Sequence, residues 1–509
     1  MKNEEIRFSD RRESQWLREL INEKWFAYIG VLIVSFLVSC TETVYNAVLS
    51  DKMPTIFPDY VGVTIPATIA PMNFSVEGDV DKVDVVVKGS KGGEMHVQGE
   101  YADFDLDEWH NLVASNKGGK LTFTVCAKSD GRWTRYRDFD MHVSNYDMKD
   151  YGLTYRRIAP GYEVYSHMGL YERRLDNFDE RAIIENTQVP GMCVNCHTSC
   201  KTNPDNFVFH IRGDHGATLV KSGGKCELLK AKNDSIKGSM VYPYWHPSGK
   251  YCAFSTNMTR QGFHIVKDER VEVFDLSSDV FVYDIEKHQL ILDTLLSTKL
   301  YSENSPVFSA DGRTLYYLTS LQKEYPLQFK DQKYNLCSIA FDPDKGAFGN
   351  KVDTVYNAVS MGKTVTWPRP SYDGRYLMFT QMDYGYFSIW HKESDLWLLD
   401  LRTMKAHPLK AANSDDADSF HNWSIGSHWF VFTSRRIDGL YSHLYLSCID
   451  EKGQPTKAFL LPQKNPKDYY SQSLYSFNTP DFTSHPVELD SREVARQISS
   501  DKRIETTIK

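Results

Sequence analysis

Short runs of alternating apolar and polar residues fill the second half of the chain and recur with a common turn. Three copies contain a proline, an aromatic-rich run, a turn glycine and a second apolar run; the glycines are Gly249, Gly312 and Gly374, and a weaker copy has Ser427 in their place. The copies lie roughly 50 to 65 residues apart, and a further pair of strand-like runs follows each. Asp and Gly adopt the dihedral angles of a tight turn at low cost. Four strands per period predict the blades of a β-propeller, which we place at residues 206–484 with five or six blades.

Upstream of the repeat, clear alternation is confined to residues 71–150. Runs such as 82–88 and 120–126 alternate with a period of two, and glycine pairs separate them. About seven short strands in this span predict a small N-terminal β-sandwich of the immunoglobulin or fibronectin type. The expected fold class is therefore all-β.

The remaining segments have weaker patterns. Residues 151–205 have few periodic runs, so we expect an irregular connector between the sandwich and the propeller. Residues 41–70 are expected to be a linker, and residues 485–509 are expected to be a poorly ordered polar tail.

The N-terminal segment indicates where the chain resides. Residues 25–39 carry no charge and end at Cys40. This run is shorter than the about 20 apolar residues of a membrane-spanning helix but has the length of a signal-peptide core. Residues 37–40 resemble a bacterial lipobox, so we expect residues 1–40 to be a signal peptide and Cys40 to be lipidated. The alternative is a short membrane anchor with a buried cysteine. The polar leader is long, which also fits a start downstream of Met1.

Residues 193–200 contain the clearest chemical motif. Cys193 and Cys196 form a Cys-x-x-Cys pair, and His197 follows directly. This is the attachment sequence of c-type haem, in which two thiols bind the vinyl groups and the histidine is the proximal iron ligand. With 9 Cys and 16 His in 509 residues, chance placement gives about 0.005 occurrences. The alternatives are a thioredoxin-like redox pair, half of a zinc site and a disulfide. The loop-rich context of Pro190 and Pro204, and the lack of a second Cys-x-x-Cys in the sequence, favour one covalent haem c.

The sixth iron ligand stays open at this point. The candidates are His210, Met168 and His215, with His167 and Met192 also near in sequence. His210 lies in an alternating run typical of a strand, whereas Met168 lies in a loop-like segment. A methionine ligand would raise the reduction potential relative to two histidines, and an open position would permit peroxide or small-ligand chemistry.

Charge and composition exclude several classes of protein. The chain has 59 basic and 67 acidic residues, for a formal charge of −8, and no dense basic run. It is therefore a poor candidate for binding nucleic acid. A hydrophobic share of 41% with 30 Tyr and 27 Phe indicates a folded, strand-rich protein rather than a disordered one.

The repeat resembles the WD40-like repeats of TolB-type β-propellers. Together with the lipobox and the Cys-x-x-Cys-His segment, the chain resembles a family of exported, cytochrome c-like TolB-type propellers. The resemblance implies haem attachment at Cys193, Cys196 and His197, and it implies no substrate.

These features predict a lipid-anchored protein in the cell envelope of a Gram-negative bacterium, facing the periplasm or the cell surface. The leading hypothesis is a monohaem c-type protein that passes electrons to or from a periplasmic or membrane redox protein, with the propeller as docking scaffold. The first alternative is a propeller module that binds a protein or the cell wall, with a haem or disulfide that is only structural. The second is a haem-dependent periplasmic oxidoreductase. No motif of a hydrolase, nucleotide-binding enzyme or metalloprotease is recognisable in the sequence, so no catalytic residues are assigned.

Overall fold

The structure is a computed structural model that describes residues 43–159, 167–230, 236, 238–263, 271–500 and 502–509. The chain divides into two units, Met1–Ala47 and Val48–Lys509, and the strands and helices of the described residues lie in the second unit. Cys40 and the predicted signal peptide lie outside the described residues. Within the described ranges, no helix combines the length and the apolar character needed to cross a membrane.

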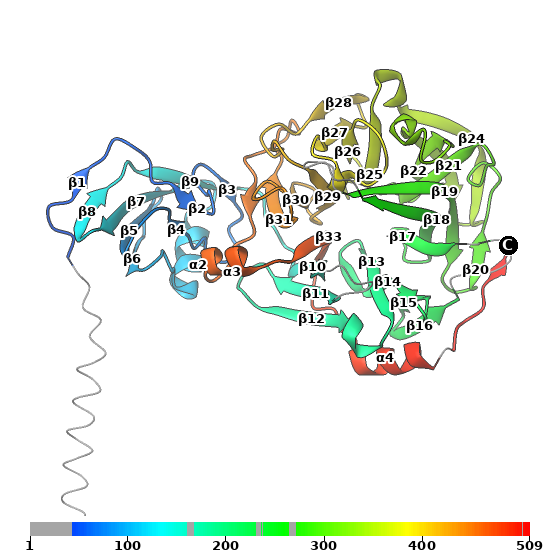
Figure 1. Cartoon of the computed structure of the whole chain (residues 1–509), viewed down its shortest axis with the longest axis horizontal. Helices are drawn as coiled ribbons and strands as arrows, with labels where there is room; N and C mark the ends of the chain where they lie inside the picture. The colour runs from blue at the N-terminus through cyan, green and yellow to red at the C-terminus, as the bar shows by residue number, and fades with distance from the viewer. Residues whose placement is uncertain (1–42, 160–166, 231–235, 237, 264–270, 501) are drawn as a thin grey trace, which may run out of the picture. The chain divides into compact units, whose positions relative to one another are not determined.

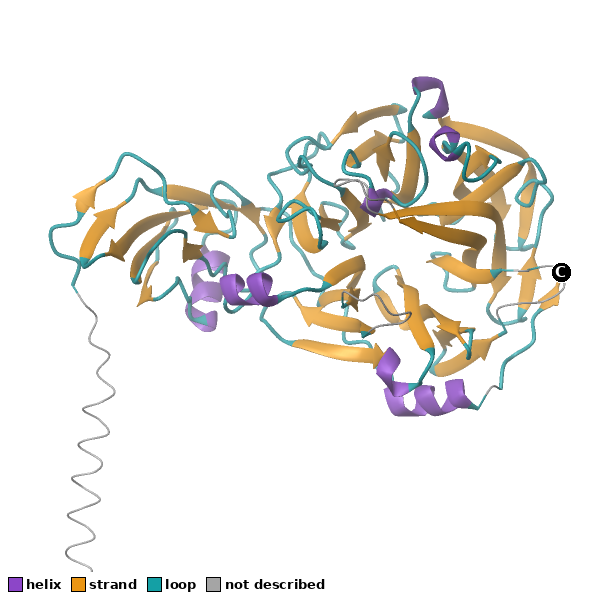
Figure 2. Cartoon of the chain, viewed as in Figure 1, coloured by secondary structure: helices purple, strands orange, loops and turns teal. Residues whose placement is uncertain are grey.

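Six antiparallel sheets in the described residues form the blades of a β-propeller (Figure 1 and Figure 2), which confirms the predicted fold class. Blade 2 consists of β13 (Met192–Cys200), β14 (Asn203–Gly213), β15 (Ala217–Ser222) and β16 (Lys225–Leu229). Blade 3 consists of β17 (Ser239–Trp245), β18 (Tyr251–Phe263), β19 (Val271–Asp284) and β20 (Gln289–Ile291). Blade 4 consists of β21 (Tyr301–Phe308), β22 (Thr314–Leu321), β23 (Asn335–Asp342) and β24 (Ala347–Tyr356). Blade 5 consists of β25 (Thr364–Pro370), β26 (Tyr376–Met382), β27 (Asp395–Asp400) and β28 (Lys405–Pro408). Blade 6 consists of β29 (Asp418–Trp423), β30 (Trp429–Ser434), β31 (His443–Cys448) and β32 (Phe459–Leu460).

Blade 1 closes the ring with strands from distant parts of the chain. Its outer strands are β10 (Gly152–Ile158), β11 (Met168–Arg174) and β12 (Glu180–Glu185), and its inner strand is β33 (Ser476–Thr483). β33 pairs antiparallel with β10, so that Thr154 and Asp481, 327 positions apart, lie opposite each other. β33 also contacts β13 of blade 2 and β29 of blade 6.

Each inner strand has a bulge at the same position. The residue there has a positive φ between 46° and 54°, which non-glycine residues rarely adopt. These six residues are Cys196, Tyr242, Ser305, Trp367, Phe420 and Thr479. The residue that follows is a proline in four blades and a histidine, His197 or His421, in the other two. A bulge changes the direction in which the side chains of its strand point. In every blade this change occurs on the inner strand, next to the propeller axis.

The N-terminal part of this unit is a sheet with one helix. Seven strands form the sheet: β1 (Val48–Leu49), β3 (Thr64–Ile65), β5 (Lys82–Gly89), β6 (Glu94–Gly99), β7 (Lys120–Ser129), β8 (Arg132–Arg135) and β9 (Phe139–Val143). A separate pair is formed by β2 (Ile56–Phe57) and β4 (Ser75–Val76). The helix α2 (Leu106–Ser115), which the sequence analysis did not predict, begins after Asp105, whose carboxylate accepts from the backbone N–H groups of Asp107 and Glu108. Trp109 of this helix is fully buried and stacks on Phe104.

Three segments are more ordered than the sequence analysis predicted. Residues 151–205 are not an irregular connector: they form β10 to β13, whose weak periodicity reflects burial on both faces in blades 1 and 2. Residues 41–70, expected to be a linker, contribute β1, β2 and β3. Residues 485–509 are not a disordered tail, because α4 (Ser491–Ser499) buries Val494 and Ile498 beside blade 2, and β34 (Thr507–Ile508) pairs with β20. The helix α3 (Pro466–Gln472) precedes β33.

Candidate ligand-binding cavity in the propeller channel

A cavity of about 420 Å³ lies on the propeller axis, where the inner strands have their bulges. Five of the six positive-φ residues line it; the exception, Ser305, hydrogen bonds to the hydroxyl of Tyr386, which is itself a lining residue. The hairpin formed by β18 and β19 adds Gln261 and Val273 to the wall. The volume lies within the range of about 300–1,000 Å³ that is typical of small-molecule sites.

Two arginines are the charged residues among the described lining residues of the cavity. Arg156 of β10 and Arg212 of β14 line it, and neither a carboxylate nor a histidine is among its described lining residues. The Nη2 atom of Arg156 lies 3.1 Å from the sulfur of Met168 and 3.3 Å from the sulfur of Cys193. Sulfur is a weak acceptor. Among the described residues, Arg156 therefore has no carboxylate partner for its charge.

Aromatic rings from several blades form the rest of the wall. The ring of Trp367 in blade 5 meets Tyr242 of blade 3 edge-on at 6.1 Å and Phe420 of blade 6 at 4.9 Å. The indole N–H of Trp367 donates to the carbonyl of His421 at 3.1 Å, which fixes the ring. Burial raises the pKa of Tyr242 and of Tyr386, so both hydroxyls are neutral at physiological pH. The described wall can bind a ligand but contains no acid or base that titrates near neutral pH.

The two motif cysteines lie on the cavity side of blade 2. Cys193 lies opposite Arg212 on β14, and Asn195 lies opposite His210, so these side chains share one face of the sheet. Arg212 and Asn195 both line the cavity, as does Cys196 at the bulge. The opposite face, represented by Val194 and its partner Ile211, packs on blade 1.

His197 points the other way. Its Nε2 atom lies 3.1 Å from the hydroxyl oxygen of Thr154 in blade 1, and its ring centre lies 5.9 Å from that of Phe207. Burial lowers the pKa of His197 to about 4, so the ring is neutral. The three side chains of the motif do not converge, and as arranged they do not fit a haem bound by both thiols and this histidine. Haem attachment at these residues stays a prediction.

The alternative interpretations of the Cys-x-x-Cys pair can be compared with its geometry. Both cysteines lie on one extended strand, which separates their Cα atoms by roughly 9 to 10 Å. A disulfide needs Cα atoms about 4.4–6.8 Å apart, so bridging this pair would require the strand to distort. In the described part of the chain, no group of three or more His, Cys, Asp or Glu side chains is placed to hold a metal ion.

The predicted sixth ligands are dispersed. Met168 lies on β11 beside Arg156, and His210 is fully buried on β14 with its Nδ1 atom 3.2 Å from the hydroxyl of Thr218. Burial lowers the pKa of His210 to about 3. His215 lies between β14 and β15, and its carbonyl accepts from Arg503. The described lining residues of the cavity include none of these three, and they do not include His167 or Met192.

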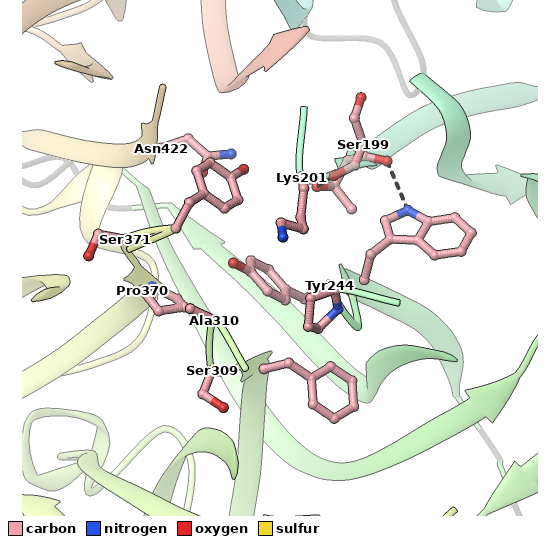
Figure 3. A pocket seen from close by; sticks show the side chains of 13 residues that line it. Ser199, Lys201, Tyr244, Ser309, Ala310, Pro370, Ser371 and Asn422 are labelled. Carbon is pink, nitrogen blue, oxygen red and sulfur yellow. Dashed lines mark hydrogen bonds between the residues drawn. The ribbon is translucent and has the colours of Figure 1, made fainter. Parts of the chain in front are cut away.

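A buried polar network lies beyond the cavity, further along the inner strands. Asp481 accepts hydrogen bonds from the backbone N–H of Ser199 at 2.8 Å, the hydroxyl of Thr198 at 3.1 Å and the amide of Asn422 at 2.7 Å. Burial raises the pKa of Asp481 to about 6, against the lowering effect of these hydrogen bonds. Past this network a small cavity of about 20 Å³, with room for about one water molecule, has Lys201 and Tyr244 in its wall (Figure 3).

The sequence analysis did not identify the arginines and aromatic residues that line the cavity. Arg156 and Arg212 lie in strands that the sequence analysis did not connect, and no spacing rule links residue 156 to residue 212. Trp367 and Tyr242 could have been found, because each directly precedes the proline of a repeat copy. That position marks the bulge of the inner strand.

Comparisons with known proteins find only distant similarity to solved structures. No family model and no curated protein matches the chain. A puromycin-hydrolyzing peptidase from Mycobacterium tuberculosis is 13% identical, with a TM-score of 0.36 over 68% of this chain and 52% of that one. Prolyl oligopeptidase B from Galerina marginata is 12% identical, with a TM-score of 0.34 over 77% and 54%. An oligogalacturonate lyase in complex with manganese is 12% identical, with a TM-score of 0.30 over 79% and 99%. The chain spans about half the length of the two peptidases. These similarities assign no activity to it.

Proposed function

We propose that this protein is a ligand-binding propeller whose axial cavity holds a small molecule or the end of a chain. The observation that carries the proposal is the cavity of about 420 Å³ into which five of the six inner-strand bulges turn a residue. The network around Asp481 lies beyond it and supports a site with one entrance rather than an open channel. Rigid strands hold the wall in place, which lowers the entropic cost of binding.

A haem-bearing electron carrier is the second candidate. The support for it is that Cys193 and Cys196 both lie on the cavity side of blade 2. Because His197 lies on the other side, the arrangement of the motif gives electron transfer less support than ligand binding. The lipid anchor at Cys40, the cell-envelope location and a redox partner rest on the sequence analysis.

The binding proposal can be tested with the neutral fluorescent probe N-phenyl-1-naphthylamine. We expect the wild type to bind the probe with one-to-one saturation. Val273→Trp fills part of the cavity, and we expect it to weaken binding at least tenfold. The matched control is Val352→Trp on β24, whose side chain is 36% exposed away from the cavity, and we expect it to bind as the wild type does. Equal binding by the wild type and Val273→Trp would refute the proposal.

A further inference from the structure

We propose that the ligand of the axial cavity is a flat, apolar molecule with a carboxylate or similar anionic group, which Arg156 binds. This inference rests on the proposed binding function and names the chemical class of the ligand. It follows from the charge at one side of the cavity and the rings at the other.

The first argument is the charge of Arg156, which has no carboxylate partner in the described part of the chain. Its Nη2 atom contacts the sulfur atoms of Met168 and Cys193, which are neutral and weak acceptors. A partly buried guanidinium without a carboxylate is costly, because its charge has lost water and gained no partner. An anionic ligand would supply that partner through a charge-assisted hydrogen bond, and guanidinium geometry suits a carboxylate.

The second argument is the charge of Arg212 on the same side. Arg212 lies across from Cys193 and lines the cavity with Arg156. Burial raises the pKa values of Cys196 and Tyr242, and the positive charge of Arg212 acts in the opposite direction on both, so its field extends into the cavity. No described lining residue adds a negative charge. Arg156 and Arg212 are therefore the charged groups among the described lining residues, and a positive charge at a cavity wall attracts an anion.

The third argument is the aromatic wall. Trp367 packs edge to face on both Tyr242 and Phe420, which leaves its ring little freedom to rearrange. The guanidinium of Arg369 lies 4.2 Å from the centre of the Trp367 ring, and this cation–π contact helps to fix the ring. Trp390, another lining residue, is backed in the same way by Arg435 at 4.8 Å. Rigid rings of this kind favour a flat body that can stack on them.

Two kinds of molecule combine a flat apolar body with a carboxylate. Haem, which the Cys-x-x-Cys-His motif predicts, is a flat ring with two carboxylates, and a free aromatic acid has the same features. Protein made in a host that attaches c-type haem distinguishes them. A covalent mass increase that requires Cys193 and Cys196 would identify haem as the ligand, and its absence together with acid binding would identify a free acid. Because the motif side chains do not converge, we expect the free acid, and a haem adduct would overturn the assignment of the cavity to such an acid.

The deciding experiment compares 1-pyrenebutyrate with the uncharged 1-pyrenebutanol on protein made without haem attachment. We expect the acid to bind at least tenfold more tightly than the alcohol. Arg156→Gln should reduce this preference to within about threefold, and Arg156→Lys should retain part of it. Arg402→Gln, an exposed arginine in the turn after β27, is the control and should behave as the wild type.

The outcomes separate the two proposals. Equal affinity for acid and alcohol in the wild type would overturn the ligand class and leave the binding function standing. Failure of both compounds and of the neutral probe to bind would overturn the binding function as well. An unchanged acid preference in both Arg156 variants would show that Arg156 is not the anion-binding group.

Discussion

Glu272 of β19 and His391 form a buried ion pair that ties blade 3 to blade 5, which is not its neighbour. The Oε1 atom of Glu272 lies 3.5 Å from Nε2 of His391, and Nδ1 of the same ring lies 3.4 Å from Glu393. The edge of Tyr384 packs on the ring at 4.7 Å. Val273, next to Glu272, lines the axial cavity, so this contact fixes one side of the cavity.

The ion pair predicts an alkaline loss of stability. Burial lowers the pKa of His391, but Glu272 and Glu393 outweigh it and raise the pKa to about 9. Because this pKa is above the unfolded value, the stabilisation is complete below pH about 6.5 and is lost as the pH rises through about 9. We expect the free energy of unfolding in urea to fall by roughly 1–3 kcal/mol between pH 7 and 10.

Glu272→Gln tests the origin of this effect. The variant should be less stable than the wild type at pH 7 and lose less stability toward pH 10. Glu286→Gln, at an exposed residue in the turn after β19, should follow the wild type. A wild-type stability that does not change between pH 7 and 10 would contradict the prediction.

Asp481 is expected to be essential for closing the ring. Asp481→Ala leaves the hydroxyl of Thr198, the backbone N–H of Ser199 and the amide of Asn422 without their acceptor. Each orphaned buried donor costs about 1–3 kcal/mol, so we expect a loss of at least about 3 kcal/mol in urea unfolding. Asp353→Ala, at an exposed ion pair, should cost less than about 0.5 kcal/mol. Similar losses in the two variants would argue against this role for Asp481.

The C-terminal helix is expected to be part of the folded core. Ile498 is fully buried with Val494 against blade 2, whereas Ile508 is 50% exposed. Ile498→Ala should destabilise the protein by about 2–4 kcal/mol, and Ile508→Ala by less than about 0.5 kcal/mol. The measurement is denaturant unfolding of the full chain. Equal stability of the two variants would mean that α4 does not contribute.

Haem attachment gives a fourth prediction, in which His197 has a structural role. If covalent haem is present, Cys193→Ser with Cys196→Ser should abolish the added mass, and Cys226→Ser should not. His197→Ala removes the contact with Thr154, so we expect stability to fall by about 1 kcal/mol and the absorption spectrum to stay unchanged. A shifted Soret band in this variant would instead identify His197 as an iron ligand. Colourless protein from a competent host would refute the haem prediction.

The propeller could be predicted because its turns need particular residues. Gly249, Gly312 and Gly374 all have φ between 72° and 74°, and Ser427 in the weaker copy has φ 61°. These turns join the inner and second strands of blades 3 to 6. A repeated local constraint of this kind is visible in the sequence, so these four blades were identified.

Blades 1 and 2 and the cavity could not be predicted in the same way. Blade 1 depends on pairing between β10 and β33, and no local signal in residues 152–158 indicates a partner near residue 480. The motif at Cys193 to His197 suggested a loop, but these residues form the inner strand of blade 2. His197 occupies the position that proline occupies in four other blades, and this equivalence appears only once the strands are aligned in space.

The position of β33 also determines when this molecule can fold. A nascent chain that has completed blades 2 to 6 still presents the unpaired edge of β10, because the strand that covers it is translated only after those blades. Until then the exposed edge is available to chaperones or to the same edge of another nascent chain.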